Sequence, residues 1–374
     1  MRRPRLRVGL DACPFEEKRT GVGNYLFNLM SEMRELNPPI DFFLYSRAEI
    51  SADGRSFGEV REHVGHIARS GPLWMNTGLN ALIARDDLDI FWGTNGYIPF
   101  LRQGRTKYIV TIHDLVHLFA RHTITRETYA ARRIVQSFAA RRADAVTTVS
   151  DATAADIRKH HGRTADLILH PRMERAFNHP VDADDLRRLR ERFALPQDFL
   201  LVLGTLEPRK NVVTILRAYR SAIEAGYRLP RLVVAGAKGW RSREIEEIVD
   251  DLVRQDLIQK LDFVPQDLLP ALYAACSLFL FLPIYEGFGM PLREALMCGA
   301  TALASDIPSL REAGGAAATY IPHDQASIEA ALRAYAADPA VFRGRPAFAL
   351  AHEEKGQASD FLRLIGALTA ERVS

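Results

Sequence analysis

The sequence predicts an α/β protein of two Rossmann-like domains with parallel sheets. Short apolar runs alternate with stretches of helical period along the chain, which is the order typical of parallel α/β sheets. The pattern starts afresh at Phe199–Leu203 (FLLVL), after a stretch at Pro171–Pro180 that shows neither strand nor helix period. The length of 374 residues suits two domains. A ligand is then expected in the crevice between the domains, at the carboxyl ends of the strands.

The first half is expected to hold six strands and two long helices. One helix begins at Asn24, because Tyr25, Leu29 and Met33 recur at helical spacing, and another covers about Ile124–Arg142. The expected strands are Leu6–Leu10, Asp41–Tyr45, Asp89–Trp92, Lys107–Ile112, Ala145–Val149 and Leu167–Leu169.

The second half repeats the alternation. The expected strands are Phe199–Leu203, Arg231–Ala235, Leu261–Val264 and Ser277–Leu282. The expected helices are Asn211–Ala225, Ser242–Gln255, Asp267–Ala275, Gly289–Cys298 and Asp324–Ala337, and a final helix covers about Glu353–Arg372.

Composition argues for a globular chain in a reducing compartment. The sequence is 47% hydrophobic and 25% charged, as in ordinary globular proteins. Its longest apolar run, Ala271–Pro283, is shorter than the roughly 18 residues of a membrane span. No signal-peptide pattern opens the chain. Cys13, Cys276 and Cys298 show neither a disulfide framework nor metal-ligand spacing, so we expect a cytoplasmic location.

Charge is distributed unevenly between the halves. Residues 1–177 hold 26 basic and 20 acidic side chains, a net charge of +6, and residues 178–374 hold 23 and 26, a net charge of −3. Residues 101–150 alone have 9 basic and 3 acidic side chains. Two halves of unlike charge suggest two domains that face different partners.

The first candidate site is the loop that ends in Arg19–Asn24 (RTGVGN). Gly21 and Gly23, placed just before a helix, would let the backbone approach a ligand, and the helix N-terminus would offer N–H groups to a phosphate. A tight turn explains the glycines equally well. The loop lacks the Lys of a P-loop and the three spaced glycines of a dinucleotide site.

The second candidate site is Gly204–Asn211 (GTLEPRKN), which follows a buried strand. Asn211 is placed to cap the next helix. Arg209 and Lys210 could neutralise a diphosphate with help from the helix dipole. A solvated basic turn is the alternative.

The third candidate site, Pro283–Glu294 (PIYEGFGMPLRE), carries the strongest signal. Two glycines flank an aromatic residue between a buried strand and a helix that begins near Pro291. Backbone N–H groups of Gly289 and Met290 would face an anion, and Glu286 and Glu294 could accept hydrogen bonds from sugar hydroxyls. A capping Glu and a surface Glu would not explain both glycines.

The fourth candidate site is Thr111–Asp114 (TIHD), at the end of an apolar strand. A lone His is often a structural hydrogen-bonding group. The position of His113 at the carboxyl end of a strand makes a catalytic role an equal alternative.

At these four points the chain resembles the retaining glycosyltransferases of family 4, whose GT-B fold consists of two facing Rossmann-like domains. The resemblance covers nearly the whole chain and is most specific at Glu286–Glu294, two Glu separated by seven residues. Gly204–Asn211 and Val149–Asp151 are also similar to family segments. The pattern is closest to bacterial mannosyl- and rhamnosyltransferases that build O-antigen, capsule or exopolysaccharide. It implies an N-terminal acceptor-side domain at 1–175, joined by a C-terminal helix at about 353–374 that crosses back, and a donor domain at 176–350.

The resemblance implies roles for the donor domain. Lys210, helped by Arg209, would bind the donor diphosphate, Glu286 would hold hydroxyls of the donor sugar, and Glu294 would bind the ribose. Val264, which ends an expected strand with Phe263, would lie beside the base. The residues whose backbone would contact sugar and phosphate are Gly287, Phe288, Gly289 and Met290.

In the N-terminal domain, Gly21 and Gly23 would close over the diphosphate, and His113, next to Asp114, would lie beside the transferred sugar. The sequence departs from the family in two places. Many relatives have an Arg where this chain has Thr205, so Arg209 could compensate. The linker His170–Glu174 (HPRME) replaces the usual PNGVD.

The expected reaction is transfer of a hexosyl group from a nucleotide diphosphate sugar to a hydroxyl with retained anomeric configuration. Fixed cations and N–H groups would stabilise the leaving diphosphate. No Asp-x-Asp metal motif is evident, and the family generally needs no metal, so no cofactor is expected. The resemblance favours front-side attack, in which the diphosphate takes the acceptor proton.

The acceptor is expected to be a lipid-linked or growing oligosaccharide. Residues 118–142 place Ile134, Val135 and Phe138 along one helical face and Arg126 and Arg133 on the other. The basic face either is solvated or rests on an anionic membrane surface.

Two functions other than sugar transfer remain open at this point. A GT-B sugar-nucleotide 2-epimerase would share the two sheets, and a non-catalytic GT-B scaffold would share the whole fold. A nicotinamide oxidoreductase would need a glycine fingerprint that is missing. Nucleic acid is not an expected partner, because the basic residues lack an aromatic-interleaved motif.

Overall fold

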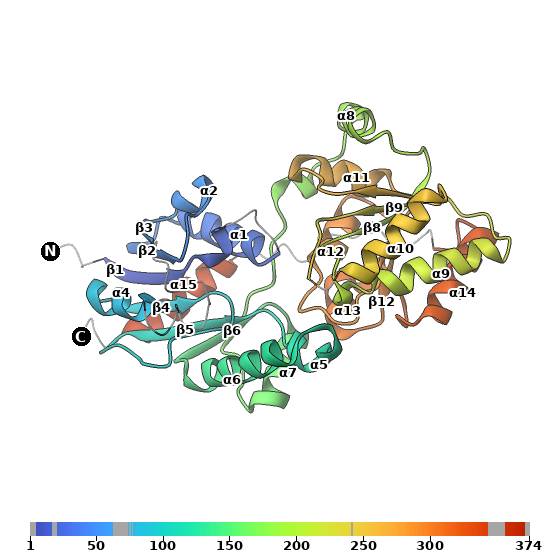
Figure 1. The fold of residues 1–374 in the computed structure, drawn as a ribbon. Helices are drawn as coiled ribbons and strands as arrows, with labels where there is room; N and C mark the ends of the chain where they lie inside the picture. The colour runs from blue at the N-terminus through green and yellow to red at the C-terminus, as the bar shows by residue number, and fades with distance from the viewer. Residues whose placement is uncertain are drawn as a thin grey trace. The chain divides into compact units, whose positions relative to one another are not determined.

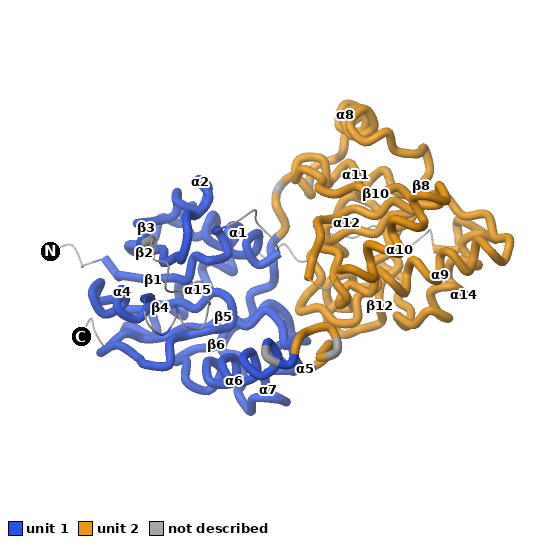
Figure 2. The backbone as a smooth tube through the Cα atoms, in the orientation of Figure 1, with its two compact units in different colours: residues 1–118, 126–172, 352–374 blue, residues 119–125, 173–351 orange. Residues whose placement is uncertain are grey.

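The computed structural model describes residues 5–16, 21–62, 74, 76, 78–240, 242–342 and 356–370. The chain divides into two compact units (Figure 2). Unit 1 consists of residues 1–118, 126–172 and 352–374, and unit 2 of residues 119–125 and 173–351. After Arg172 the chain leaves unit 1 for the main part of unit 2, and each unit is described below by itself.

Unit 1 is built on a parallel sheet of seven strands in the order β3-β2-β1-β4-β5-β6-β7 (Figure 1). The order reverses between β1 and β4, where Val8 pairs with Ile90. The strand bounds are β1 Leu6–Asp11, β2 Ile40–Ser46, β3 Glu59–Glu62, β4 Ile90–Gly93, β5 Lys107–Ile112, β6 Ala145–Thr148 and β7 Leu167–Ile168. The short strand β3 was not predicted.

The helices of unit 1 follow the apolar periodicity. In α1 the buried residues include Tyr25, Leu29 and Met33, as the spacing predicts. On α6, Val135 is buried, but Ile134 is 63% exposed, so the predicted apolar face is wrong at Ile134. The bounds are η1 Cys13–Phe15, α1 Gly21–Glu35, α2 Ala52–Arg55, α4 Gly78–Asp86, α5 Val116–Phe119, η2 Arg121–Thr123, α6 Arg126–Arg142, α7 Asp151–His161 and α15 Gln357–Thr369, with η2 and the end of α5 assigned to unit 2.

The C-terminal helix α15 returns to the first sheet, as a helix that crosses back should. The ring of Phe361 lies 4.5 Å from that of Trp92 on β4, and both side chains are buried. The Ala358 backbone N–H donates to Glu32 on α1 at 3.4 Å. The two ends of the chain therefore complete one core.

Unit 2 is built on a parallel sheet of six strands in the order β10-β9-β8-β11-β12-β13. Leu200 and Val202 of β8 pack with Val212 and Ile215 of α9. The bounds are β8 Phe199–Leu203, β9 Arg231–Ala235, β10 Ile258–Leu261, β11 Leu278–Phe281, β12 Ala302–Ser305 and β13 Thr319–Ile321. The predicted strand at 261–264 in fact occupies 258–261, and β12 and β13 were not predicted.

Helices flank this second sheet. They are α8 Ala183–Phe193, α9 Val212–Glu224, α10 Arg243–Arg254, α11 Leu269–Ala275, α12 Met290–Met297, α13 Pro308–Gly314 and α14 Gln325–Ala337, with the short turns η3 Arg175–Asn178, η4 Pro208–Lys210, η5 Gln266–Leu268 and η6 Gly315–Ala317. In the part of the chain that the structure describes, no helix combines the length and apolar character needed to cross a membrane. The cysteines are unbonded.

Candidate active site

The topology of unit 2 brings two of the predicted motifs together. Strand order reverses between β8 and β11, and in open parallel sheets ligands bind outside the carboxyl ends of the strands at such a point. Gly204–Asn211 follows β8, and Pro283–Gly289 follows β11. The Ile284 N–H donates to the Arg209 carbonyl at 2.9 Å, which joins the two loops directly.

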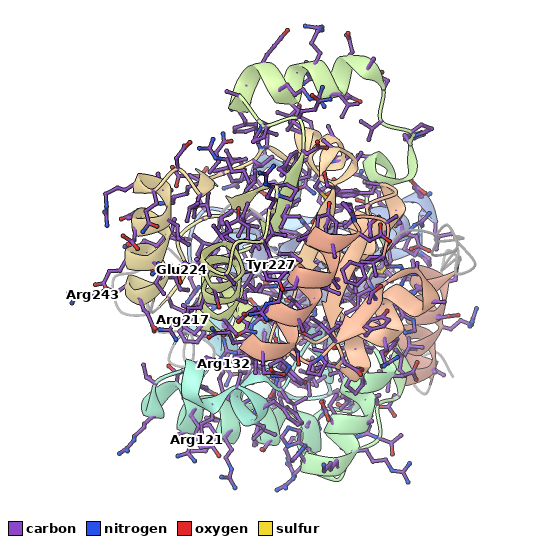
Figure 3. The ribbon with its side chains drawn as sticks, turned by 90° about the vertical axis from the view of Figure 1, so that its right-hand side faces the viewer. Arg121, Arg132, Arg217, Glu224, Tyr227 and Arg243 are labelled. Carbon is purple, nitrogen blue, oxygen red and sulfur yellow. The ribbon has the colours of Figure 1, made fainter. Side chains whose placement is uncertain are left out.

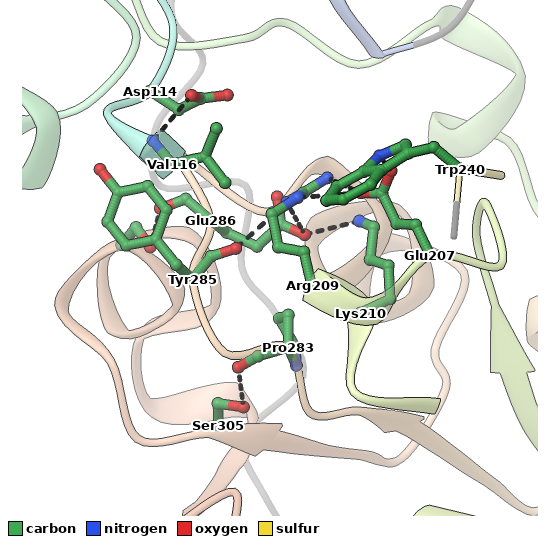
Figure 4. A network of polar contacts seen from close by, with 11 residues as sticks. Asp114, Val116, Glu207, Arg209, Lys210, Trp240, Pro283, Tyr285, Glu286 and Ser305 are labelled. Atoms are coloured by element: carbon green, nitrogen blue, oxygen red, sulfur yellow. Dashed lines mark hydrogen bonds and ion pairs between the residues drawn. The ribbon is translucent and has the colours of Figure 1, made fainter. Parts of the chain in front are cut away.

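Three predicted residues meet in one charged cluster at this edge (Figure 4). Lys210 Nζ lies 2.5 Å from Glu286 Oε1, and Arg209 Nη1 lies 2.8 Å from the same oxygen. The side chains of Arg209, Lys210 and Glu286 are only 18%, 13% and 11% exposed. Lys210 Nζ also lies 4.9 Å from the ring centre of Phe281 on β11. Charges this poorly hydrated interact strongly, so the carboxylate and both cations hold one another in place.

The cluster keeps Glu286 ionised. Burial alone would raise the pKa of Glu286, but Arg209 and Lys210 outweigh it and hold that pKa below its ordinary value. Burial lowers the pKa of Lys210, assisted by Arg209 and opposed by Glu286. The carboxylate can therefore accept hydrogen bonds from hydroxyl groups, and the adjacent cations can attract an anion.

Backbone geometry explains the Gly204–Asn211 loop. Gly204 has a φ of +140° and Asn211 a φ of +61°, conformations that glycine and asparagine tolerate. Asn211 precedes α9, but its side chain does not cap the helix and instead donates to the His323 carbonyl at 2.7 Å. The predicted cap is wrong because a capping side chain requires the extended backbone region, which Asn211 does not occupy.

Two residues that the sequence did not single out orient Arg209. Glu207 Oε1 lies 2.6 Å from Arg209 Nη2 and accepts from Nε at 2.9 Å. Glu207 Oε2 accepts from the indole N–H of Trp240 at 2.6 Å (Figure 4). Glu207 belongs to the same motif as Arg209, so the sequence could have indicated it as a site residue. Trp240 lies 33 residues away in sequence, and no local pattern links it to the site.

The second loop is fixed by glycine and serine. Gly289 has a φ of +106°, and a Cβ there would lie 2.3 Å from Leu310. Ser305 donates to the Pro283 carbonyl at 2.7 Å, and Ser309 to the Glu286 carbonyl at 2.8 Å. Gly289 is the residue before α12. Pro291 has no N–H, and the Leu292 N–H donates to the Gly289 carbonyl at 3.0 Å, so the N–H groups of Gly289 and Met290 are the ones at this helix end that suit an anion.

Side-chain burial limits what the remaining loop residues can do. Phe288 is 4% exposed, with the Arg293 guanidinium 5.4 Å from its ring centre, so its side chain packs and only its backbone suits a ligand. Gly287 is also buried, and Met290 begins α12. Val264 is 7% exposed and follows β10 by three residues rather than ending a strand, while Phe263 is 52% exposed.

Glu294 occupies a separate buried position on α12. Tyr273 on α11 donates to its Oε2 at 3.0 Å, and Glu294 is 7% exposed. Burial raises the pKa of Glu294 to about 7, and the charge of Glu174 adds to the rise, while Tyr273 and Lys210 oppose it. Tyr273 gave no sequence signal, because it reads as an ordinary core residue of a helix.

Unit 1 presents an uncharged group at the corresponding edge. His113 follows β5, its ring lies edge-on to Tyr25 at 5.0 Å, and its Nε2 lies 2.7 Å from the Thr94 carbonyl. A carbonyl can only accept, so Nε2 carries the proton and Nδ1 is left as an acceptor. Burial lowers the pKa of His113, with Thr94 and Asp114 opposing, so the ring is neutral at pH 7.

The neighbouring predicted residues have structural contacts. Asp114 Oδ1 accepts from the Val116 N–H at 3.0 Å and so shapes the turn into α5. Gly21 and Gly23 lie within the first turn of α1, not in a loop before it, so the predicted helix start at Asn24 is wrong by three residues. A glycine reads as a loop residue from sequence, but the first helical turn tolerates it. Arg19 and Thr20 lie outside the described residues.

Each half of the chain matches a known family model. Residues 186–341 match the family model "Glycosyl transferases group 1", and residues 19–170 match "Glycosyltransferase Family 4". The chain belongs to the group 1 and family 4 glycosyltransferases. Its GT-B fold resembles that of sucrose-phosphate synthase from Thermosynechococcus elongatus, with a TM-score of 0.73, 17% identity and coverage of 99% of this chain and 98% of that one.

Two curated relatives of this glycosyltransferase come from Escherichia coli. O-antigen chain mannosyltransferase B is 28% identical over 85% of this chain and 87% of its own length. Serotype-specific mannosyltransferase WbdA is 30% identical over 67% of this chain, but the match spans only 31% of WbdA. Family membership makes the protein a transferase and removes the epimerase and oxidoreductase alternatives.

Proposed function

We propose that this glycosyltransferase moves a mannosyl or related hexosyl group from a nucleotide diphosphate sugar to a hydroxyl of a lipid-linked or growing oligosaccharide in cell-surface polysaccharide synthesis. The observation that carries the proposal is the buried cluster of Arg209, Lys210 and Glu286 beside the N-terminus of α12. It combines two cations for a diphosphate with an ionised carboxylate for sugar hydroxyls. The mannosyltransferase relatives favour mannose as the sugar.

The proposed chemistry retains the anomeric configuration. The acceptor oxygen bonds to the anomeric carbon on the face from which the diphosphate leaves, the bond from that carbon to the phosphate oxygen breaks, and the acceptor proton passes to the diphosphate. Arg209, Lys210 and the N–H groups at the start of α12 stabilise the negative charge that develops on the leaving group. Glu286 holds hydroxyls of the sugar, and Glu294 those of the ribose. His113 Nδ1 accepts a hydrogen bond from a hydroxyl of the transferred sugar.

The donor is tested with a panel of nucleotide sugars that includes GDP-mannose. Selective thermal stabilisation by one nucleotide family identifies the base, because a ligand that binds only the folded state raises its stability. Transfer to a lipid-linked oligosaccharide is then followed with the identified donor. NMR of the product gives the anomeric configuration, and an inverted product would refute the retaining mechanism.

We also propose that unit 1 meets its lipid-linked acceptor on an anionic membrane surface. Arg126, Arg133 and Arg141 recur on α6 at spacings of seven and eight residues, which places them along one stripe of the helix. No carboxylate that the structure describes forms an ion pair with any of the three. Exposed Ile134 lies next to this stripe, and half-exposed Phe100 packs against Phe138 of the same helix at 4.8 Å.

Arginines on helices of unit 2 behave differently. Arg217 on α9 and Arg243 on α10 are labelled in Figure 3. Arg217 lies 2.8 Å from Glu244, and Arg243 lies 3.0 Å from Glu247. Arg187 on α8 pairs with Asp184 and Glu191. Pairing neutralises these side chains locally, whereas the α6 stripe keeps its charge for an external anion. The apolar side chains beside the stripe are suited to contact acyl chains.

Vesicle co-sedimentation tests this membrane proposal. Arg126→Glu, Arg133→Glu and Arg141→Glu together should abolish binding to anionic vesicles at low salt. A matched triple variant of the paired arginines, at positions 187, 217 and 243, should bind like the wild type. Absence of wild-type binding, or equal loss in both variants, would refute the proposal.

A further inference from the structure

Glu207 is a buried carboxylate bonded from two sides. It is 8% exposed, and its two oxygens face different partners, Arg209 on one side and the indole N–H of Trp240 on the other. Arg209 in turn reaches Glu286 through Nη1, which also donates to the Tyr285 carbonyl at 3.1 Å. A continuous chain of polar contacts therefore runs from Trp240 through Glu207 and Arg209 to Glu286 (Figure 4).

The backbone holds the loop that carries Trp240 against the Gly204–Asn211 loop. Leu206 and Lys238 form a parallel bridge, and the Gly239 N–H donates to the Leu206 carbonyl at 3.2 Å. A Cβ at Gly239 would lie 2.8 Å from both the Leu206 oxygen and the Thr205 side chain. The close contact of the Gly239 backbone with Leu206 and Thr205 therefore requires glycine. It places the next residue, Trp240, beside Glu207.

The arrangement acts on the guanidinium of Arg209. Glu207 engages Nε and Nη2, while Glu286 and the Tyr285 carbonyl engage Nη1, so the planar group is held along two of its edges. Side-chain contacts of this kind fix both the position and the plane of a cation. With threonine at position 205, Arg209 is the arginine that this loop offers to the site.

We infer that Glu207 and Trp240 are positioning residues that set the Arg209 guanidinium for the leaving diphosphate. The inference rests on the proposed function, in which Arg209 stabilises that group. The Glu207 charge offsets that of Arg209, so Glu207 does not strengthen diphosphate binding by itself. Its contribution is orientation, which acts on the transition state, and kcat is therefore the parameter that responds.

The test compares Glu207→Gln, Trp240→Phe, the double variant and the control Glu244→Gln. Glu244 is a matched control because it also pairs with an arginine, Arg217, at 2.8 Å. We expect kcat to fall about 10-fold in Glu207→Gln and about 3-fold in Trp240→Phe, because misorientation of one group costs that order of rate. The Kd of the nucleoside diphosphate should stay within about 2-fold of wild type or tighten in Glu207→Gln.

The double variant tests whether the two residues act as one unit. Its kcat should equal that of Glu207→Gln, because Trp240 acts through Glu207. Additive losses, an unchanged kcat in Glu207→Gln, or a weakened Kd with unchanged kcat would each overturn the inference. Thermal unfolding of every variant separates these results from a loss of folded protein.

Tryptophan fluorescence supplies a spectroscopic readout. The protein has three tryptophans, and Trp74 and Trp92 are each 1% exposed, whereas Trp240 is 37% exposed. Addition of the nucleoside diphosphate should change the wild-type emission, and Trp240→Phe should abolish the change. A change that persists in Trp240→Phe would show that Trp240 does not sense the site.

Turnover by the wild-type enzyme distinguishes a failure of the positioning role from a failure of the proposed function. If the wild-type enzyme transfers sugar and Glu207→Gln has the same kcat, only the positioning role is overturned. A wild-type protein that transfers from no nucleotide sugar and binds no nucleoside diphosphate overturns the proposed function.

Discussion

The two units share one topology and differ in the chemistry at the edge where strand order reverses. In each sheet the strand order reverses between two neighbouring central strands. These strands are β1 and β4 in unit 1, and β8 and β11 in unit 2. Unit 2 places Arg209, Lys210 and Glu286 there as a charged cluster, while unit 1 places a neutral His113 held by Thr94. One scaffold thus carries a charged edge in unit 2 and an uncharged edge in unit 1, which the proposed function assigns to the diphosphate and to a sugar hydroxyl.

The largest effect is expected from the charged edge. Lys210→Ala and Glu286→Ala should each reduce transfer at least about 10³-fold, because a buried charge aimed at the reacting group is lost. Arg209 remains to pair with Glu286 in Lys210→Ala, so the fold should survive. Initial rates with the identified donor measure the loss, and Lys238→Ala, at an exposed ion pair with Glu246, is the control. Wild-type turnover by either variant would refute the assignment.

Glu294 gives a smaller effect that depends on pH. Its pKa is raised from 4.5 to about 7 in the folded state, so the stabilisation from its proton is full below pH 4.5 and is lost as pH rises through 7. The loss is roughly 3 kcal/mol for such a shift. Urea unfolding of Glu294→Gln should therefore show a flatter dependence on pH between 4.5 and 7 than wild type. Identical slopes would contradict the raised pKa.

The uncharged edge should respond more modestly. His113→Asn should lower kcat about 10-fold, since the shorter side chain loses the Nε2 contact with the Thr94 carbonyl that holds the acceptor in place for the transferred sugar. The pKa of His113 lies below its ordinary 6.5, so the ring should titrate only below that pH. The wild-type rate should accordingly show no loss from His113 protonation between pH 7 and 8. A rate that fell as pH dropped from 8 to 7, with the fall absent in His113→Asn, would show that the ring becomes charged.

The smallest effect is expected from metal removal. In the proposed function Arg209 and Lys210 supply the positive charge that the diphosphate needs, and we propose that transfer therefore needs no divalent cation. Treatment with EDTA should leave the initial rate within about 2-fold of the untreated enzyme, because side-chain cations and N–H groups carry the stabilisation. A rate that collapses with EDTA and returns with Mg²⁺ would contradict this.

Local sequence signals predicted much of the charged edge. Lys210, Arg209 and Glu286 each follow a buried strand, and parallel strands end at a common edge, so their meeting follows from the pattern. Glu207 lies in the same loop after β8, so its place at this edge could also have been predicted. The places of Trp240 and Tyr273 could not have been predicted. Trp240 contacts Glu207 and Tyr273 contacts Glu294 across distant segments of the chain, and no periodicity in the sequence indicates such contacts.

The sequence failed to predict the short strands for a different reason. The strands β12 (ALAS) and β13 (TYI) are too brief to show a period. The strand β10 lies three residues before its predicted place because Phe263 and Val264, both typical strand residues, belong to the loop that follows. Tertiary packing, rather than propensity, decides such boundaries.

The proposed function assigns the charge of the diphosphate to Lys210 and Arg209 of unit 2, and a hydroxyl of the transferred sugar to His113 of unit 1. Isothermal titration of the nucleoside diphosphate into wild type, Lys210→Ala and His113→Asn tests it most directly. We expect affinity at least about 100-fold weaker in Lys210→Ala, since a buried charge-assisted contact is lost, and affinity within about 2-fold of wild type in His113→Asn. Equal losses in both variants, or none in Lys210→Ala, would contradict it.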